Sequence, residues 1–333
     1  LCIQTARLHA RPLDTSRPLW EAYVIEGLDN VAGVPAGSFA LMTKFHHAAI
    51  DGVSAAEISA AFHDVSPADS VDTPEEDWQP EAFPTAMGLL GRTAVTTAKK
   101  PFEFGSLLAK SAPAAWRFGR GLLKKELQLT TNVPRTRFNG NVSPHRVFDG
   151  RSFSLDEIRA IKSSVDGATV NDVIVSVCGG ALRQYLESKG ELPEESLVAM
   201  APVSARPDDM RNAAGNMVST MSLPVRSDIA DPLDRLRAVR GESEKAKRLT
   251  RTVGASLATD LAHFLPSTTS GLLANAYGRY GLAKRLPPIF NTIITNVPGP
   301  NFPLYSMGSR MVASFGVGPI VHGLGLFQPV IGY

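Results

Sequence analysis

The chain has 333 residues, of which 44% are hydrophobic and 20% are charged, and its formal net charge at pH 7 is +2. A chain of this length suits two domains of ordinary size, each with its own apolar core. The near-neutral charge argues against a nucleic-acid partner held by overall basicity. No run of about 18 apolar residues is present, so no membrane-spanning helix is expected.

The first residues predict a lobe that mixes strands and helices. The chain opens as if inside a helix, and apolar runs predict strands over 20–28 and 38–46. In the first strand we expect Ala22, Val24 and Ile25 to face inward. Alternation of this kind is typical of a strand with one face against a core.

A helical pattern over 53–62 follows, and 66–84, rich in proline and acids, predicts an exposed linker. The next stretch, 84–129, is helical and basic. Apolar side chains interleave with its cations, so it is either an ordinary solvated helix face or a surface that docks on anionic lipid. Its basic residues are Arg92, Lys99, Lys100, Lys110, Arg117, Arg120, Lys124 and Lys125, against Glu103 and Glu126.

Residues 131–144 are polar and rich in turn formers, and they predict a crossover linker between a first lobe over 1–130 and a second over 145–333. In the second lobe Ser154 and Glu157 form the capping-box pattern that begins a helix. The predicted strands cover 145–153, 197–203, 217–225 and 289–296, and two more follow. The predicted helices cover 170–189, which Gly190 closes, then 232–248 and about 253–280.

Two cysteines, Cys2 and Cys178, lie too far apart in sequence for a zinc or disulfide framework. Cys178 sits in an apolar stretch, and we interpret it as a small core residue. A reducing interior is the expected setting.

Residues that could carry chemistry concentrate in the segment His46-His47-Ala48-Ala49-Ile50-Asp51-Gly52. A histidine at the end of a strand can project into a cleft, and neutral imidazole, with an ordinary pKa of about 6.5, can accept a proton near neutral pH. Asp51 can lock the turn that follows, and Gly52 lets the backbone turn sharply. The alternative is a pair of surface histidines before a helix that Asp51 caps.

Three further blocks stand beside this motif: Pro12-Leu13-Asp14-Thr15-Ser16-Arg17-Pro18-Leu19-Trp20-Glu21, Asn171-Asp172-Val173 and Asn296-Val297-Pro298-Gly299-Pro300. With them, nearly the whole chain resembles the bacterial wax ester synthase/acyl-CoA:diacylglycerol acyltransferase family, especially its actinobacterial branch. The histidine motif alone is shared with peptide-synthetase condensation domains and the wider coenzyme A-dependent acyltransferase superfamily. The first and last blocks narrow the choice.

The resemblance implies an α/β (α+β) fold of two chloramphenicol-acetyltransferase-like lobes, with mixed sheets flanked by helices and an active-site tunnel between the lobes. It also implies that His47 is the catalytic general base, while His46 and Asp51 support the motif and Asp51 is mainly structural. The family has a longer N-terminal segment and a C-terminal tail, so we expect both ends to be truncated here.

The Pro12–Glu21 block is expected to shape the first lobe. Asp14 and Arg17 are interpreted as fixing a turn, and Trp20 as a core residue. Thr15 stands where the family often has Arg, and we expect little effect on the chemistry because Asp14 and Arg17 remain.

The expected reaction moves a long-chain acyl group from acyl-CoA to diacylglycerol, with fatty alcohols as a second acceptor class. Acyl-CoA is a co-substrate, and no cofactor or metal is expected. The oxyanion needs preorganised donors, for which Asn296 and Asn171 are the candidates, and Asp172 is a further candidate site residue of the second lobe. A structural alternative is that Asn171 caps its helix and Asp172 stabilises the helix N-terminus.

Two other functions stay open: a condensation-type domain that forms amides or esters on carrier-bound substrates, and a non-catalytic lipid-binding relative. A covalent acyl-enzyme is disfavoured because the chain has no G-x-S-x-G nucleophile elbow. The expected location is the cytoplasm, peripheral on the inner membrane face or on lipid inclusions. We interpret the remaining histidines as surface or structural: His9, His63, His145, His263 and His322.

Overall fold

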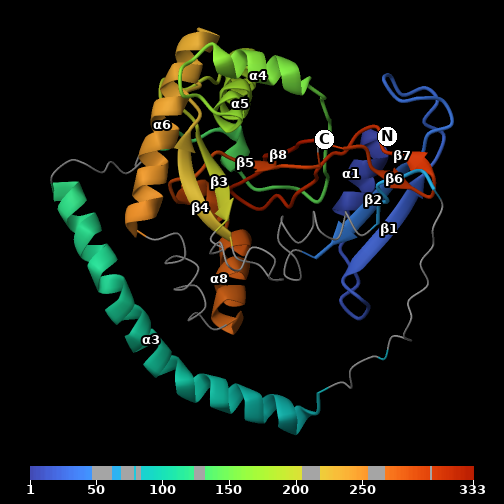
Figure 1. Cartoon of the computed structure of the whole chain (residues 1–333). Coiled ribbons are helices and arrows are strands. Elements are labelled where there is room, and N and C mark those ends of the chain that lie inside the picture. Colours follow the sequence, from blue (N-terminus) through green and yellow to red (C-terminus); the bar gives the residue numbers. More distant parts are fainter. Residues whose placement is uncertain are drawn as a thin grey trace.

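The structure is a computed structural model, and it describes residues 1–46, 62–68, 79, 84–123, 132–204, 218–253, 267–300 and 302–333. Its helices and strands form two groups (Figure 1): a two-stranded hairpin with the first helix beside it, and a four-stranded sheet covered by helices. This mixed α/β organisation confirms the predicted fold class.

The hairpin consists of β1 (Trp20–Ile25) and β2 (Ala40–Phe45), paired antiparallel so that Trp20 lies opposite Phe45. Helix α1 (Cys2–Ala10) packs beside it. The Lys44 ammonium on β2 ties the two together, since it donates to the Leu8 carbonyl at 3.3 Å and also to the Arg11 carbonyl. The C-terminal end of α1 is thereby held on the hairpin.

The face of β1 that was predicted to be buried is wrong for two of the three residues. Ala22 is exposed and Val24 is 61% exposed, whereas Ile25 is half-buried as predicted. Polar contacts occupy the packed face: Glu21 pairs with Lys44 at 3.6 Å and accepts a 2.6 Å hydrogen bond from the Tyr23 hydroxyl. Because both faces carry apolar residues, period-two alternation alone could not identify the buried one.

The larger sheet has the strand order β4-β3-β5-β8. The antiparallel pair at one side is β3 (Val198–Ser204) and β4 (Val218–Pro224), while β5 (Thr292–Val297) runs parallel to both β3 and β8 (Phe327–Ile331). The strands predicted over 197–203, 217–225 and 289–296 are therefore confirmed to within a few residues. Parallel strands end at one edge of a sheet, so the ends of β3, β5 and β8 share an edge.

Helices α4 (Leu155–Ser163), α5 (Val170–Glu187) and α6 (Pro232–Val253) accompany this sheet. Two further helices, α8 (Ser267–Arg279) and α9 (Leu282–Arg285), precede β5. The sheet's core joins α5 and α6 to β3 and β4, through Val175, Leu186, Leu197, Leu223, Val225 and Val239. A Cβ at Gly179 would lie 2.1 Å from the Val225 carbonyl oxygen, so only glycine lets α5 approach β4 this closely.

Part of the predicted linker is packed in the structure, and the strand predicted after it does not form. Residues 132–140 are packed into the second half through a short 3₁₀ helix, η1 (Arg137–Asn139), whose Asn139 is buried. The strand predicted over His145–Phe153 is wrong, because the segment pairs with no neighbour as a strand. Val147 is 97% exposed, and without a partner strand an alternating sequence has no ladder to join.

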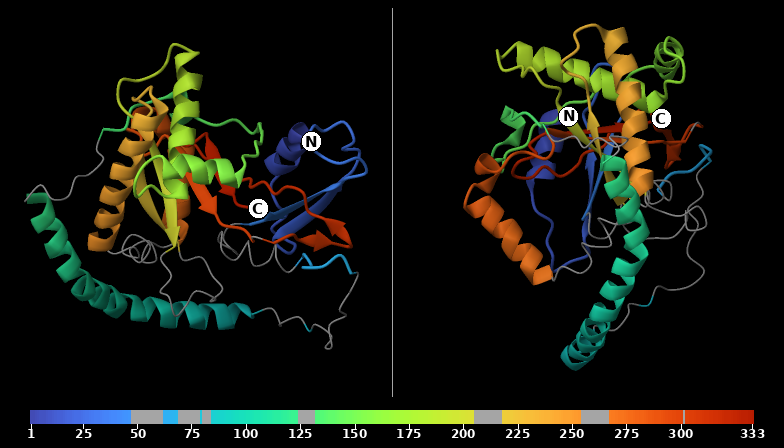
Figure 2. Two further views of the ribbon diagram at one scale, coloured as in Figure 1. Left: turned by 45° about the horizontal axis from the view of Figure 1, so that its top comes forward. Right: turned by 90° about the vertical axis from the view of Figure 1, so that its left-hand side faces the viewer.

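The two groups of elements are joined by the last part of the chain (Figure 2). A small hairpin, β6 (Tyr305–Ser306) with β7 (Ser309–Arg310), lies near β1 and β2. Tyr305 and Asp64 exchange backbone hydrogen bonds of 2.7 and 2.8 Å. The ring Nε2 of His9 lies 3.2 Å from the Gly318 carbonyl oxygen. Contacts between residues far apart in sequence thus hold the last part of the chain against the first group of elements.

Helix α3 (Ala86–Leu123) extends away from both sheets in Figure 1 and in the left-hand view of Figure 2. Among the described elements its one substantial contact is with α6. None of the described helices is long and apolar enough to cross a lipid bilayer.

Candidate active site

His46 directly follows β2, and its backbone N–H donates to the Leu19 carbonyl at 3.0 Å. The hairpin therefore brings two sequence blocks side by side, because Leu19 belongs to the Pro12–Glu21 block and His46 begins the histidine motif. His47, Asp51 and Gly52 lie outside the described residues. The start of the motif therefore follows a strand end, as the sequence predicts, and His46 is exposed there.

The turn inside the Pro12–Glu21 block is confirmed. Asp14 Oδ1 accepts from the Ser16 backbone N–H at 2.9 Å and from the Ser16 hydroxyl at 2.6 Å, and Asp14 Oδ2 lies 3.4 Å from Arg17 Nε. These hydrogen bonds from Ser16 lower the pKa of the Asp14 carboxyl. Trp20, predicted to be a core residue, is 54% exposed, because the face of β1 that carries it is the uncovered one.

Asn171 and Asp172 lie in the first turn of α5. The helix is capped by Thr169, whose hydroxyl oxygen accepts the Asp172 N–H at 3.3 Å, while Asp172 Oδ2 accepts the Thr169 N–H at 2.8 Å and its hydroxyl at 2.7 Å. Capping by Asn171 is therefore wrong, and the stabilising role for Asp172 is confirmed. Asn171 is left half-buried with a side chain that this capping does not use.

Asn296 lies near the end of β5, where it is exposed and pairs in register with Val330 of β8. The backbone after it is held tightly, since the Gly332 N–H donates to the Val297 carbonyl at 3.0 Å. A Cβ at Gly299 would lie 1.8 Å from the Gly332 carbonyl oxygen. The Pro-Gly-Pro sequence thus does more than end a strand, because its glycine permits direct backbone contact with the strand's neighbour.

A buried pair of asparagines, which the sequence reasoning missed, holds β5 in place. Asn291 Oδ1 accepts the Val198 N–H at 2.9 Å, and its Nδ2 donates to the Pro134 carbonyl at 2.6 Å and to Asn139 Oδ1 at 2.9 Å. Asn139 Nδ2 in turn donates to the carbonyls of Phe290 and Gly323. The available signal was Asn291, a polar residue directly before the apolar strand β5. Its partners are distant in sequence, so the signal did not reveal the pair.

The structure separates the candidates onto three elements. His46 follows β2 in the first group, Asn171 and Asp172 begin α5, and Asn296 lies on β5. Burial raises the pKa of the Cys178 thiol to about 11, which fits a core residue rather than a nucleophile. His322 Nδ1 lies 3.1 Å from the Val142 backbone nitrogen, as expected of a structural histidine. Within the described part of the chain, no three His, Cys, Asp or Glu residues are grouped as metal ligands would be.

A two-lobed mixed α/β protein, with a His-His-x-x-x-Asp-Gly motif following a strand and a second lobe that presents asparagines, has the make-up of a coenzyme A-dependent acyltransferase. Comparison with protein families refines this class. The model of the wax ester synthase/diacylglycerol acyltransferase catalytic domain matches residues 1–174, and that of the WS/DGAT C-terminal domain matches residues 214–333.

Individual relatives agree with these matches. A Mycobacterium tuberculosis protein named as a diacylglycerol O-acyltransferase is 36% identical over 327 residues, which are 97% of this chain and 68% of the relative. A second protein of that organism with the same named activity, tgs2, is 33% identical over 325 residues, with the same shares covered.

A solved structure is similar over the whole chain. The wax ester synthase/diacylglycerol acyltransferase from Marinobacter aquaeolei VT8 aligns with a TM-score of 0.62 and 27% sequence identity, covering 100% of this chain and 67% of that one. The chain therefore belongs to the wax ester synthase/diacylglycerol acyltransferase family, and it is an acyltransferase by that membership.

Proposed function

We propose that this chain moves a long-chain acyl group from acyl-CoA to the hydroxyl of diacylglycerol, and also to fatty alcohols, with His47 as the general base. The observation that carries the proposal is the pairing of the two family blocks at the end of the hairpin, through the 3.0 Å bond from His46 N–H to Leu19. That bond sets the start of the histidine motif on a fixed strand end. The named activities of the relatives support the same acceptor.

The proposed chemistry is direct transfer in one complex. The imidazole of His47 accepts the proton of the acceptor hydroxyl as the hydroxyl oxygen forms a bond to the thioester carbonyl carbon. The tetrahedral intermediate then breaks its carbon–sulfur bond, and the protonated His47 returns the proton to the leaving thiolate. The products are an ester and free coenzyme A. No resident cofactor is needed, because the thioester itself supplies the activated acyl group.

The negative charge on the intermediate requires hydrogen-bond donors that are already oriented. Asn296 is our first candidate, because it is exposed near the end of β5, where the strand pairs with β8. Asn171 is the second, because the helix cap leaves its amide unused. Asp172 is assigned to the cap alone, since its carboxylate already holds Thr169.

The test replaces His47 by Ala and by Gln and measures thioester release from a long-chain acyl-CoA with diacylglycerol, a fatty alcohol or an amine as acceptor. General base catalysis typically contributes about 10²–10⁴-fold, so we expect a loss of that order in both variants, with the fold and acyl-CoA binding retained. His63→Ala, which lies outside the motif, is the matched control. Wild-type turnover in a folded His47 variant would refute the mechanism, and preference for the amine would favour a condensation-type enzyme.

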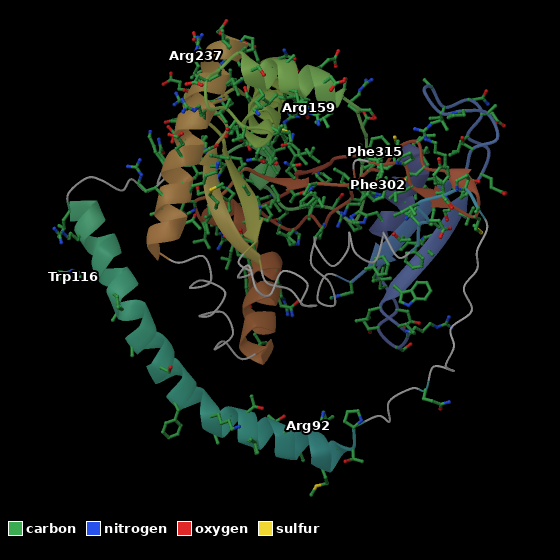
Figure 3. All side chains as sticks on the ribbon, viewed as in Figure 1. Arg92, Trp116, Arg159, Arg237, Phe302 and Phe315 are labelled. Carbon is green, nitrogen blue, oxygen red and sulfur yellow. The ribbon has the colours of Figure 1, made fainter. Side chains whose placement is uncertain are left out.

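We further propose that the chain works at a lipid surface and that α3 is the part that binds it. Described side chains along this helix are strongly exposed although apolar, including Met87, Leu90, Trp116 at 73% and Leu123 at 88%. Figure 3 shows Arg92 and Trp116 near opposite ends of the helix. The chain would thus sit peripherally on the inner membrane face or on lipid inclusions.

The spacing of the charges supports a surface orientation for α3. At about 100° per residue, the described positions 92 and 99 lie nearly on one line along the helix, and they hold Arg and Lys. Positions 87, 90, 116 and 123 fall roughly on the other side, and each is apolar. A basic stripe opposite an apolar one is typical of helices that lie in a membrane interface.

Vesicle co-sedimentation tests this surface. We expect binding to vesicles that contain anionic lipid, weakened by rising salt and by the double variant Arg92→Glu/Lys99→Glu. The matched control is Arg159→Glu on α4, an exposed arginine far from α3 in Figure 3. Binding that ignores both salt and lipid charge would remove the electrostatic part of the proposal.

A further inference from the structure

A cavity of about 360 Å³ lies between α1 and the unpaired segment that follows the first lobe. Its cationic side chains are Arg7 and Arg11 at the end of α1 and Arg146 from the segment, and its lining also includes His145, Ala6 and Phe148. None of its described lining residues belongs to the histidine motif. Its size falls within the range of small-molecule sites in proteins.

The charges in this cavity are not balanced by acids. Among the ion pairs formed by the described residues, none involves Arg7, Arg11 or Arg146. Arg146 Nη1 donates to the backbone carbonyls of Ser143 at 2.6 Å and His145 at 3.0 Å, which orient the guanidinium but leave its charge unpaired.

Asp149 directly follows the lining residue Phe148 in sequence. Its Oδ1 lies 4.0 Å from the Cys2 thiol and accepts the Gly150 N–H at 2.9 Å, so its recorded contacts are with these groups and not with the arginines. Arg7 and Arg11 stand one helical turn apart on the same side of α1, where like charges repel each other. A bound anion would relieve that repulsion.

We propose that this cavity binds the phosphorylated nucleotide end of acyl-CoA; the inference rests on the proposed function. Guanidinium groups bind phosphate oxygens in pairs, with shorter and stronger hydrogen bonds than neutral donors form. The apolar lining, with Phe148 half-buried in it, offers a surface on which the adenine ring can lie. The cavity thus joins a phosphate site to a site for a flat, weakly polar ring.

The position of the cavity suits a substrate that must also reach the histidine motif. Lys44 anchors the C-terminal end of α1, and Arg11 itself receives one of its hydrogen bonds through its carbonyl. Lys44 precedes His46 by two residues, which at about 3.3 Å per residue is roughly 7 Å along β2. The long pantetheine arm of coenzyme A separates the nucleotide from the thioester, so one end can occupy the cavity while the other approaches the motif.

The kinetic test compares two acyl donors, acyl-CoA and the same acyl group on pantetheine, which lacks the nucleotide. For the variants Arg7→Gln/Arg11→Gln and Arg146→Gln we expect KM for acyl-CoA to rise about tenfold or more, since charged hydrogen bonds are lost. KM for acyl-pantetheine and kcat for both donors should stay unchanged. Arg159→Gln, on α4, is the control for loss of an exposed arginine. An equal effect on both donors would overturn the proposal, and so would no effect on acyl-CoA.

A binding test without turnover separates this proposal from the proposed reaction. Calorimetric titration of the folded full chain with coenzyme A, dephospho-coenzyme A and inorganic phosphate should show affinity falling in that order. In the arginine variants, coenzyme A and dephospho-coenzyme A should bind with similar, weaker affinity. Vesicles containing phosphatidic acid provide the lipid-headgroup comparison. If the arginines govern vesicle binding and leave coenzyme A binding intact, the nucleotide assignment is overturned. If coenzyme A binds through them but no acyl transfer occurs, the cavity assignment stands and the proposed function fails.

Discussion

The four-stranded sheet and the β1–β2 hairpin differ in how far helices cover the apolar side chains of their strands. In the sheet, α5 and α6 cover apolar side chains such as Leu197 and Leu223, which are fully buried. In the hairpin, the face that carries Trp20, Val24 and Leu41 remains exposed. The histidine motif starts at the end of the open element, whereas the closed sheet presents the asparagine candidates. The chemistry is therefore expected where the framework is least covered, as is common for functional sites.

Gly179→Ala is the change expected to break the closed region most strongly. Alanine favours a helix by about 1 kcal/mol over glycine, but its Cβ would lie 2.1 Å from the Val225 carbonyl oxygen, so α5 must move away from β4. We expect the free energy of unfolding to fall by more than about 3 kcal/mol in urea denaturation.

Gly241→Ala is the matched control for that change. Gly241 lies in α6, and a Cβ there meets no atom within 4 Å. We expect the control to gain about 0.5–1 kcal/mol from helix propensity. If both alanines had the same effect on unfolding, the close contact between α5 and β4 would not limit stability.

Asn291→Ala should weaken the closed region by removing the link between β5 and its surroundings. It leaves the Val198 N–H and the Pro134 carbonyl without partners in a buried site, which costs about 2–3 kcal/mol. Because β5 carries Asn296, we also expect lower acyl transfer at temperatures where the variant is still folded. Asn132→Ala is the control, since Asn132 is exposed and its side chain donates to Glu195 at 3.2 Å. Equal stability of the two variants would contradict the positioning role of Asn291.

The two regions also differ in how much of them the sequence could predict. The sheet strands were predicted because their apolar runs are long and end at clear signals, such as Pro298 and Pro300 after β5. The buried face of β1 was predicted wrongly because Glu21 and Tyr23 satisfy each other on the packed side. The Asn139–Asn291 pair is 152 residues apart in sequence, so no local pattern could join it.

The same limits apply to the candidate site. The position of His46 at a strand end follows from local pattern, and so does the turn held by Asp14. The structural alternative for Asn171 was the cap of α5, but Thr169 two residues earlier forms the box with Asp172. Thr169 and Asp172 have the S/T-x-x-D spacing, so this signal was present in the sequence.

Acidification is expected to weaken the contact between His9 of α1 and Gly318, near the end of the chain, before it affects the four-stranded sheet. Burial lowers the pKa of His9, and the cations Arg146 and Lys44 lower it further, although the bond to Gly318 opposes them. The unfolded chain then binds more protons than the folded chain near the ordinary histidine pKa of about 6.5. Stability contributed at His9 is therefore present above that pH and is lost as pH falls through it.

The measurement is the midpoint of urea unfolding between pH 7.5 and 5.5 for the wild type and for His9→Gln. We expect the wild type to lose stability on acidification more steeply than the variant, because glutamine can hydrogen-bond to Gly318 without titrating. Carboxylates and the other histidines contribute the same slope to both proteins. If the urea midpoints of the two proteins fell in parallel with pH, His9 would not be the cause of the pH-dependent loss of stability.

The smallest effect is expected at Val24, on the open face of the hairpin. Val24→Thr keeps a β-branched side chain at a position that is 61% exposed, so the free energy of unfolding should change by no more than about 0.5 kcal/mol. The same exchange at Val225, which is fully buried, places a hydroxyl in the core and should cost on the order of 1–3 kcal/mol. A cost at Val24 as large as that at Val225 would mean that the hairpin face is covered in solution. The hairpin face that leads to the histidine motif would then be buried, and the hairpin would no longer differ from the four-stranded sheet in how far its strands are covered.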